Sequence, residues 1–432
     1  MNRSDQLASG LATALLAGSW TRSQMTRRAR SALGLTRVPP WLARLVADVA
    51  AAYRDAPADR PRELAAFLQA TPAWSEALGR RAPRSRRRGA RRSRVVQWTP
   101  APTRMVRRPW PVTELPDVAA LARLLDVDQG ELCWFADVRG WERTCAPALR
   151  HYRWTPVPKR DGIRLLAAPK SRLKEIQRRL LRHVLAPIPV HDAAHGGVTG
   201  RSIRTATEPH TGTAVVLRFD LEAFFASIAA ARVWGLLRAA GLPEAVAHTI
   251  TGLLTTVAPL AVSRDPRLAT PHLPPGAPTS PRLANLIAYR LDRRLAGLAT
   301  AFGARYTRYV DDLTFSGDAS LRTGRFGDLV DAIVRAEGFA LNNGKTVIVG
   351  AADRQRVLGA VVNVHPAVPR ADRDLLRATL HNCVTRGWAT QAAGRSRDEF
   401  RDHLLGRVAW VGSVHQAHGR RLRTIADRID WD

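Results

Sequence analysis

Cysteine is scarce in this 432-residue sequence, which holds only Cys133, Cys145 and Cys383. The three lie far apart and show neither the close pairing of a zinc site nor the spacing of a disulfide framework. We therefore expect core or surface thiols and a fold that depends on no cysteine-based cross-link.

Long hydrophobic runs are also lacking. The only early apolar stretch, Leu11 to Leu16, is far shorter than the roughly 20 residues that a membrane span needs. The first residues do not have the layout of a signal peptide. We therefore expect a cytoplasmic protein with no membrane span.

Acidic residues are few relative to basic ones: 37 Asp plus Glu stand against 67 Lys plus Arg, and the formal charge is +30. Such a charge favours a polyanionic partner, either nucleic acid or an anionic membrane surface. Nucleic acid is the better interpretation, because the basic residues are spread over the chain rather than gathered on one amphipathic helix. Core material is present, since 45% of the residues are apolar.

The chain begins with a helical stretch and a basic segment. Residues 1–79 include LARLVADVAAAYRDA, which has the period of an amphipathic helix and predicts a helical N-terminal extension. Between Arg80 and Arg94 nine of fifteen residues are Arg, too dense a charge for a packed element. Residues 80–112 are therefore predicted to be a solvated linker or an arm that binds nucleic acid.

Beyond residue 112, helical and strand-like segments alternate, which indicates an α+β fold. DVAALARLLDV and SRLKEIQRRLLRHVLAPI have helical periodicity, and the second is basic on the face opposite its Leu and Ile residues. TAVVLRFDL has the β-branched run of a buried strand, and Asp161-Gly162 is a hairpin signal.

Three aspartates stand where strands end or turn. The apolar strand VVLRFD ends on Asp220, and about ninety residues later YVDDLTF places Asp311 and Asp312 between two apolar strand segments. Desolvating a carboxylate costs several kcal/mol, and like charges a few ångströms apart keep one acid protonated. For an Asp-Asp pair alone, a solvated hairpin turn is the better interpretation, and only the surrounding pattern favours a metal site.

Magnesium ions would remove both penalties, because hard carboxylate oxygens are ligands that Mg²⁺ prefers. Two such ions can activate a primer 3′ hydroxyl and stabilise the departing pyrophosphate. The residues thus predict a site for two Mg²⁺ ions, with Mn²⁺ as a substitute, whose ligands are Asp220, Asp311 and Asp312.

Four ordered motifs resemble those of the reverse transcriptases, specifically the bacterial retron-type group, within about residues 113–420. FDLEAFFASI is similar to the first metal-binding motif of that family, and RYVDDLTFSG to its paired-aspartate motif. LPPGAPTSPRLANLIAYRLDRRL resembles the loop and helix that hold template and nucleotide, and FALNNGKT the motif that follows. The resemblance implies an RNA-directed DNA polymerase, a nucleotidyltransferase with a right-hand fold.

The parts of that right hand follow from the same resemblance. The N-terminal helices and fingers are expected in residues 113–215, the palm with its catalytic motifs in 216–365, and a helical thumb in 366–432. The thumb arginines expected to hold duplex phosphates, without reading sequence, are Arg407, Arg420 and Arg421.

The resemblance also implies roles around the metal site. The Leu221 carbonyl is expected as a further oxygen ligand. Phe225, five residues after Asp220, matches the aromatic gate that excludes a ribose 2′ hydroxyl, with a buried core side chain as the alternative. Gly276 and Ala277 are expected to let the backbone approach the nucleotide, although an ordinary Pro/Gly turn has the same composition.

Cations are expected on the other side of the nucleotide. Lys345 matches the lysine thought to protonate the leaving pyrophosphate, and an ion pair with a nearby acid is its alternative. Arg164 and Lys159 flank the Asp161-Gly162 turn and resemble the fingertip cations that hold the triphosphate, with Arg164 the first candidate.

The chain departs from the retron pattern at several positions. The NAxxH element of that family reads ATEPH and keeps His210, and its VTG triplet reads VLG at residues 357–359. Both elements are linked in the family to recognition of the cognate RNA, so a different RNA or a divergent defence-associated relative is expected. The usual HGF reads HGG at residues 195–197, and Pro275 replaces a common Gln.

Three functions fit these motifs. The first is an enzyme that uses dNTPs to copy a structured non-coding RNA into DNA in an anti-phage system, with an effector or toxin protein as a further partner. The second is a polymerase-shaped RNA scaffold without catalysis, against which the three retained acids argue. The third, group II intron mobility, ranks lower because no Cys/His cluster of a DNA endonuclease follows residue 420.

Overall fold

The computed structural model describes residues 3–17, 20–54, 61–78, 95–96, 109–137, 140–159 and 162–431. Contacts divide the chain into two compact units. Unit 1 consists of Met1–His151, Ser171–Ile188 and Ala230–Thr255, and unit 2 consists of Tyr152–Lys170, Pro189–Ala229 and Thr256–Asp432.

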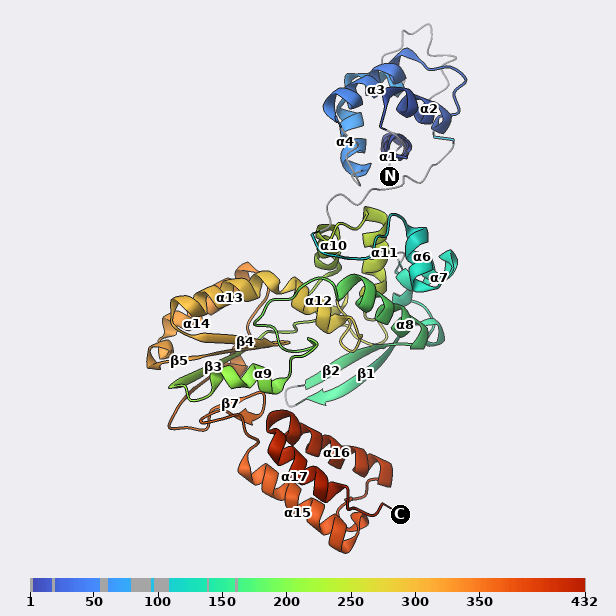
Figure 1. Cartoon of the computed structure of the whole chain (residues 1–432). Coiled ribbons are helices and arrows are strands. Elements are labelled where there is room, and N and C mark those ends of the chain that lie inside the picture. The colour runs from blue at the N-terminus through green and yellow to red at the C-terminus, as the bar shows by residue number, and fades with distance from the viewer. Residues whose placement is uncertain are drawn as a thin grey trace. The chain divides into compact units, whose positions relative to one another are not determined.

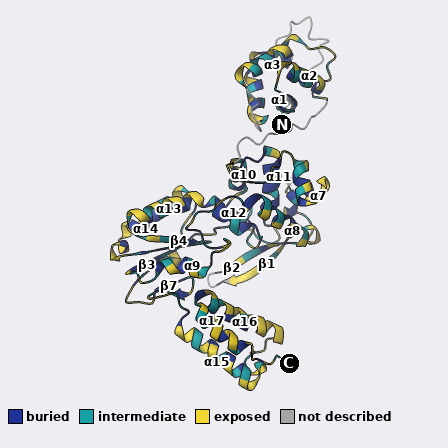
Figure 2. Ribbon diagram, viewed as in Figure 1, coloured by how far each residue is buried: buried dark blue, intermediate teal, exposed yellow. Residues whose placement is uncertain are grey.

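Unit 1 begins with five helices that share a core of their own, in the region expected to be a helical extension. They are α1 (Arg3–Leu16), α2 (Arg22–Ala32), α3 (Pro40–Ala52), α4 (Pro61–Ala70) and α5 (Pro72–Ala77). Leu11, Leu45 and Leu68 are fully buried in this core, and Figure 2 shows buried and exposed faces on these helices. The bundle therefore has its own hydrophobic interior. The Arg80–Arg94 segment that follows lies outside the described residues.

The rest of unit 1 is also helical. Its elements are α6 (Val118–Leu125), α7 (Gln129–Ala136), α8 (Ser171–Leu180), α10 (Ala230–Ala239) and α11 (Glu244–Leu254). Asp117 and Asp128 cap α6 and α7, and each side chain accepts a 2.7 Å hydrogen bond from a backbone N–H of the first turn. The basic amphipathic segment forms α8, which buries Leu173, Ile176 and Leu180.

Unit 2 is built on a four-stranded antiparallel sheet with the order β4-β5-β3-β6 (Figure 1). Its strands are β3 (Val215–Asp220), β4 (Arg305–Tyr309), β5 (Asp312–Gly317) and β6 (Val347–Gly350). The predicted apolar strand is β3, whose near-continuous burial fits its place between two neighbours. Figure 1 shows α13 (Tyr289–Ala301) and α14 (Gly324–Ala336) together over one face of this sheet.

Two further sheets in unit 2 are hairpins. β1 (Tyr152–Lys159) and β2 (Gly162–Pro169) are antiparallel, with Lys159 opposite Gly162, so residues 160 and 161 connect them. Those two residues, and the side chain of Lys159, lie outside the described part of the chain. β7 (Arg356–Val357) and β8 (Ala360–Val361) form the second hairpin, at the VLG sequence.

The remaining helices of unit 2 are α9 (Ile203–Thr207), α12 (Ser280–Ile287), α15 (Arg370–Arg386), α16 (Arg397–Val414) and α17 (Gln416–Ala426). The last three share a core that includes Leu380, Leu404 and Leu422, in the region expected to be the thumb. Ser396 and Glu399 form a capping box at the start of α16. These helices therefore make a small bundle with its own interior.

All three cysteines are free thiols: Cys133 is exposed, Cys145 half-buried and Cys383 buried. Within the described ranges, no helix combines the length and the apolar character that crossing a bilayer requires.

His210, the residue kept from the NAxxH element, is fully buried. Its Nδ1 lies 2.7 Å from Ser316 Oγ on β5, and its Nε2 lies 2.8 Å from Thr307 Oγ1 on β4. A side chain without exposed surface does not contact RNA directly. In this chain His210 instead joins the segment before β3 to the other strands of the sheet.

Acidification will destabilise the protein through His210. Burial lowers the pKa of His210 to about 3 from its ordinary value near 6.5, so the folded state holds it neutral. Its stabilising contribution is present above pH 6.5 and is lost as the pH falls toward 3, by about 2 kcal/mol at pH 5. Urea unfolding of His210→Gln, which does not titrate, will show a weaker pH dependence than wild type between pH 7.5 and 5.

His381→Gln is the matched control, because His381 is exposed on α15. It should unfold like the wild type at every pH. Equal pH dependence in wild type and His210→Gln would show that His210 is not held neutral by the fold.

Candidate active site

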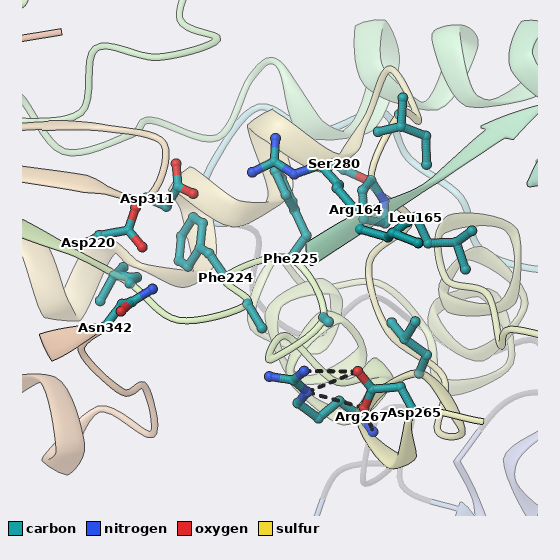
Figure 3. Close-up of a pocket in the computed structure, with 18 of the residues that line it drawn as sticks. Arg164, Leu165, Asp220, Phe224, Phe225, Asp265, Arg267, Ser280, Asp311 and Asn342 are labelled. Carbon is teal, nitrogen blue, oxygen red and sulfur yellow. Dashed lines mark hydrogen bonds and ion pairs between the residues drawn. The ribbon is translucent and has the colours of Figure 1, made fainter. Parts of the chain in front are cut away.

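A cavity of about 630 Å³ lies beside the end of β3, entirely within unit 2. Figure 3 shows Asp220 and Asp311 at one end of it and the Asp265–Arg267 pair at another. Several residues expected from the sequence lie on its wall: Arg164, Asp220, Leu221, Phe225, Gly276, Ala277, Asp311 and Lys345. Residues from five distant stretches of sequence thus meet at one place.

Strand register brings Asp220 and Asp312 together, and the turn before β5 adds Asp311; of the three, Asp220 and Asp311 line the cavity. Asp220 ends β3 and pairs directly with Asp312 at the start of β5, so both side chains point to the same face of the sheet. Asp311 precedes Asp312 in the turn, and its carbonyl accepts a 2.9 Å hydrogen bond from Leu221 N. Asp220 is 9% exposed and the other two are half-buried.

The electrostatics of these carboxylates fit a cation site. Burial raises the pKa of Asp311, and the charge of Asp220 raises it further. Burial and the charge of Asp311 raise the pKa of Asp312 to about 6. A bound cation would offset the repulsion between these carboxylates. Their oxygens are hard ligands, which suit Mg²⁺ or Mn²⁺.

Lys345 supplies positive charge at this place. It ends a 3₁₀ turn, Asn343–Lys345, and its Nζ donates to both carboxylate oxygens of Asp220 at 3.1 and 3.0 Å. In the part of the chain that the structure describes, no group of three or more His, Cys, Asp or Glu residues has a metal-holding arrangement. Lys345 forms the ion pair named as its alternative role, and this ion pair engages both carboxylate oxygens of Asp220.

The turn that carries Asp311 is strained. Val310, between β4 and Asp311, has a φ of 59°, which is left-handed and costly for a β-branched residue. Strain of this kind persists only where the surroundings hold the backbone in place. The position of the Asp311–Asp312 pair is thus imposed by its neighbours.

The GAPTSP loop lies against the β1–β2 hairpin. Ala167 N on β2 donates to Pro275 O at 2.7 Å. Gly276 has a φ of 118°, and a Cβ there would lie 3.3 Å from Ala167 O, so glycine fits the position for two reasons. Arg164, which is exposed on β2, and Ala277, which follows Gly276, both line the cavity.

The two phenylalanines after Asp220 differ in environment. Phe224 is 3% exposed and packs against Phe339, with ring centroids 5.5 Å apart, as expected of a core residue. Phe225 is half-buried and lies on the cavity wall. Of the two, Phe225 has the accessible ring.

The predicted thumb arginines do not lie on the cavity wall. Arg407 is half-buried on α16, and Arg420 and Arg421 are exposed on α17. None of the three forms an ion pair with another residue of the described ranges, whereas Arg423 pairs with Asp427 at 2.7 Å. Their side chains are therefore available to an anionic partner.

Two features of the cavity were not predicted from the sequence. Arg267 donates to Asp265 Oδ2 and to Glu222 Oε1, both at 2.9 Å, and so links the loop before α12 to the metal motif. No motif marks this loop, so no signal was available. Asn342 N donates to Asp220 O at 2.8 Å; Asn342 lies within FALNNGKT, where the motif was the available signal.

Comparisons with known proteins identify the family of this chain. The family model for the reverse transcriptase (RNA-dependent DNA polymerase) matches residues 157–362, which hold the β1–β2 hairpin, the three aspartates and Lys345. The chain therefore contains a reverse transcriptase domain with the right-hand polymerase fold.

Two similar proteins are retron reverse transcriptases. The retron Mx65 reverse transcriptase of Myxococcus xanthus is 41% identical over 71% of this chain and 74% of its own length. The retron Mx162 reverse transcriptase of the same organism is 39% identical over 72% of this chain and 66% of its own. A structure of telomerase from Candida albicans in complex with a TWJ fragment of telomeric RNA matches 64% of this chain and 63% of that chain at 11% identity, with a TM-score of only 0.35.

The chain belongs to the bacterial retron reverse transcriptases. It is accordingly an RNA-directed DNA polymerase.

Proposed function

We propose that this enzyme copies a structured non-coding RNA into DNA by two-metal nucleotidyl transfer in the cavity beside β3. The convergence of Asp220, Asp311 and Asp312 carries the proposal. These carboxylates, with the Leu221 carbonyl as a further oxygen, would hold two Mg²⁺ ions, or Mn²⁺ in their place. When bound, the metal supplies activation of the primer 3′ hydroxyl and charge neutralisation at the pyrophosphate.

The remaining cavity residues would bind the incoming nucleotide. Arg164, with Lys159 beside it in the hairpin, would hold the triphosphate through charge-assisted hydrogen bonds. The backbone at Gly276 and Ala277, which both line the cavity, would approach the nucleotide closely because neither residue has a bulky side chain. Lys345 would leave Asp220 and donate a proton from Nζ to the departing pyrophosphate.

Template and product would bind to basic residues outside the cavity. Arg407, Arg420 and Arg421 would bind duplex phosphates from the thumb, which we place at residues 366–432. We place the fingers at 113–215 and the palm at 216–365, although α10 and α11 within this palm range belong to unit 1. Residues 80–112 would serve as a linker or a nucleic-acid arm.

We further propose that the reaction takes place in the cytoplasm as part of an anti-phage system, with an effector or toxin protein as a partner. This part of the proposal rests on membership of the retron family. The VLG departure supports a template RNA different from those of other members, whereas the departing residues of ATEPH, Ala206 and Thr207, are fully buried.

Sequencing the nucleic acid that copurifies with the protein will test the proposal. Wild type is compared with Asp311→Ala/Asp312→Ala, both expressed in cells that contain the neighbouring genomic DNA. RNA in both samples, with attached DNA only in the wild type, is the expected result and names the template. RNA in both with DNA in neither would favour a scaffold without catalysis.

A further inference from the structure

A buried charged pair lies beneath the catalytic turn. Arg308 on β4 and Asp292 on α13 are both 0% exposed. The guanidinium donates from Nε to Asp292 Oδ1 at 2.7 Å and from Nη2 to Oδ2 at 2.6 Å, which is a bidentate pairing. Tyr306 donates its hydroxyl to the same carboxylate at 2.9 Å. Both oxygens of Asp292 are thereby satisfied.

The third guanidinium nitrogen of Arg308 reaches the turn itself. Nη1 donates to Val310 O at 2.9 Å and to Asn285 Oδ1 at 3.0 Å. Asn285, on α12 and 1% exposed, donates from Nδ2 to Gly196 O at 2.8 Å. One arginine thus connects the turn before Asp311 to α12 and α13, and Asn285 extends the connection to the HGG sequence.

Gly196 closes the turn from the other side. A Cβ at this position would lie 2.7 Å from Val310 Cγ2 and 2.9 Å from Val310 N, both too close for any side chain. Val310 therefore packs closely against the Gly196 backbone and accepts a hydrogen bond from the Arg308 guanidinium. Together these contacts can impose the left-handed backbone that Val310 adopts at φ 59°.

Core stability alone does not account for the Arg308–Asp292 pair. A buried ion pair contributes little net stability, and apolar residues of similar volume often replace it without loss. What an apolar pair cannot supply is a directed hydrogen bond to the Val310 carbonyl. Lysine cannot supply the whole arrangement either, because its three donors sit on one nitrogen rather than on a planar fork.

We propose that Arg308, oriented by Asp292 and Asn285, is a positioning residue that fixes the Val310 carbonyl and so directs Asp311 and Asp312 toward Asp220. The proposal deepens the proposed function and rests on it. Since α12 begins at Ser280 in the GAPTSP loop, the same network holds the nucleotide side of the cavity in register with the acidic side.

Two variants separate positioning from stability. Arg308→Met/Asp292→Leu replaces the buried pair by apolar side chains, and Arg308→Lys keeps the charge but loses the fork. The matched control is Arg294→Met/Glu337→Leu, which removes the ion pairs that Glu337 makes with Arg294 at 2.9 Å and with Arg290 at 3.5 Å, both on the same helix α13 and away from the turn. All are full-length proteins, compared by thermal unfolding in EDTA.

The expected result is a loss of function without a matching loss of stability. Both Arg308 variants should lower kcat about 10- to 100-fold, because misplacement of reacting groups by about 1 Å has effects of that order. Mn²⁺ binding, followed by electron paramagnetic resonance, should weaken about tenfold. The Met/Leu variant should unfold in EDTA within a few degrees of wild type, and the control should match the wild type in all three measurements.

Hydrogen exchange of peptides covering Tyr309–Leu313 provides a readout that needs neither metal nor substrate. The turn amides should exchange at least about tenfold faster in the Met/Leu variant, since local opening governs exchange, and at the wild-type rate in the control. Unchanged exchange and unchanged Mn²⁺ affinity would overturn the positioning role, as would losses that simply follow the unfolding temperature. A wild-type protein that makes no DNA would refute the proposed function, while exchange would still decide the role of Arg308.

Discussion

Replacing Asp311 and Asp312 together by Asn will lower the rate of primer extension on RNA at least about 1,000-fold, because charge stabilisation in such a site is worth several kcal/mol. Asparagine keeps the shape of each side chain but removes the negative charge that binds a cation. Primer extension on a primed RNA, with Mg²⁺ and separately with Mn²⁺, measures the loss. Asp328→Asn/Asp331→Asn, two acids on α14 outside the cavity, removes the same charge and should leave the rate unchanged.

The same Asn variant will be more stable than the wild type when no metal is present. The folded-state pKa of Asp312 is raised to about 6, so its favourable contribution is complete below pH 4 and is lost as the pH rises through 6. At pH 8 the wild type is destabilised by about 1–3 kcal/mol, with the lower figure allowing for partial exposure. Thermal unfolding in EDTA should show the difference at pH 8 and its decline toward pH 4. A variant that unfolds below the wild type at pH 8 would show that carboxylate repulsion is not the dominant effect.

The catalytic strands could be predicted because their signals are local. VVLRFD buries nearly every residue as β3, and YVDD interrupts two strand-like arms at the turn between β4 and β5. The pairing of Asp220 with Asp312 could not be predicted in this way, because the register between distant strands is set by the whole sheet. The prediction that these aspartates share one site rested on the order of the motifs and not on the pattern of the strands.

Arg308 could not be predicted for the converse reason. In RYTRYVDD it looks like one more arginine of a very basic chain, and arginine is usually exposed. Its partner Asp292 stands sixteen residues earlier among Arg290, Arg293 and Arg294, where nothing local distinguishes it from a surface acid. Only the packing of α13 against β4 removes both charges from water.

The division of the chain was also beyond the sequence. Residues 230–254 follow the first metal motif directly, yet α10 and α11 belong to the unit that contains the N-terminal helices. The resemblance to the reverse transcriptases gave one continuous palm range, 216–365, whereas the partners of apolar helix faces are decided by packing. The ion pair of Lys345 with Asp220, 125 residues apart, is nonlocal in the same way, and the sequence could offer it only as an alternative.

Phe225→Ala will admit ribonucleotides. If the Phe225 ring occupies the space that a 2′ hydroxyl would need, incorporating a ribonucleotide overpacks the site at a cost of about 1–3 kcal/mol, or about 5- to 150-fold. Removing the ring should therefore raise the ratio of rNTP to dNTP incorporation about 100-fold, chiefly through the rNTP term. Single-nucleotide extension with matched dNTP and rNTP measures both values of kcat/KM.

Phe224→Leu is the control, because Phe224 lines the same cavity but is only 3% exposed and packs in the protein core, whereas Phe225 is half-exposed. It should lower stability and slow both nucleotides together, leaving their ratio within about twofold of wild type, since a buried ring acts through packing. If Phe225→Ala also slows dNTP and rNTP in equal proportion, Phe225 supports the cavity wall and the selection of deoxynucleotides lies with another residue. If it raises the ratio while dNTP incorporation stays near the wild-type rate, the accessible ring after Asp220 is the element that makes this polymerase synthesise DNA.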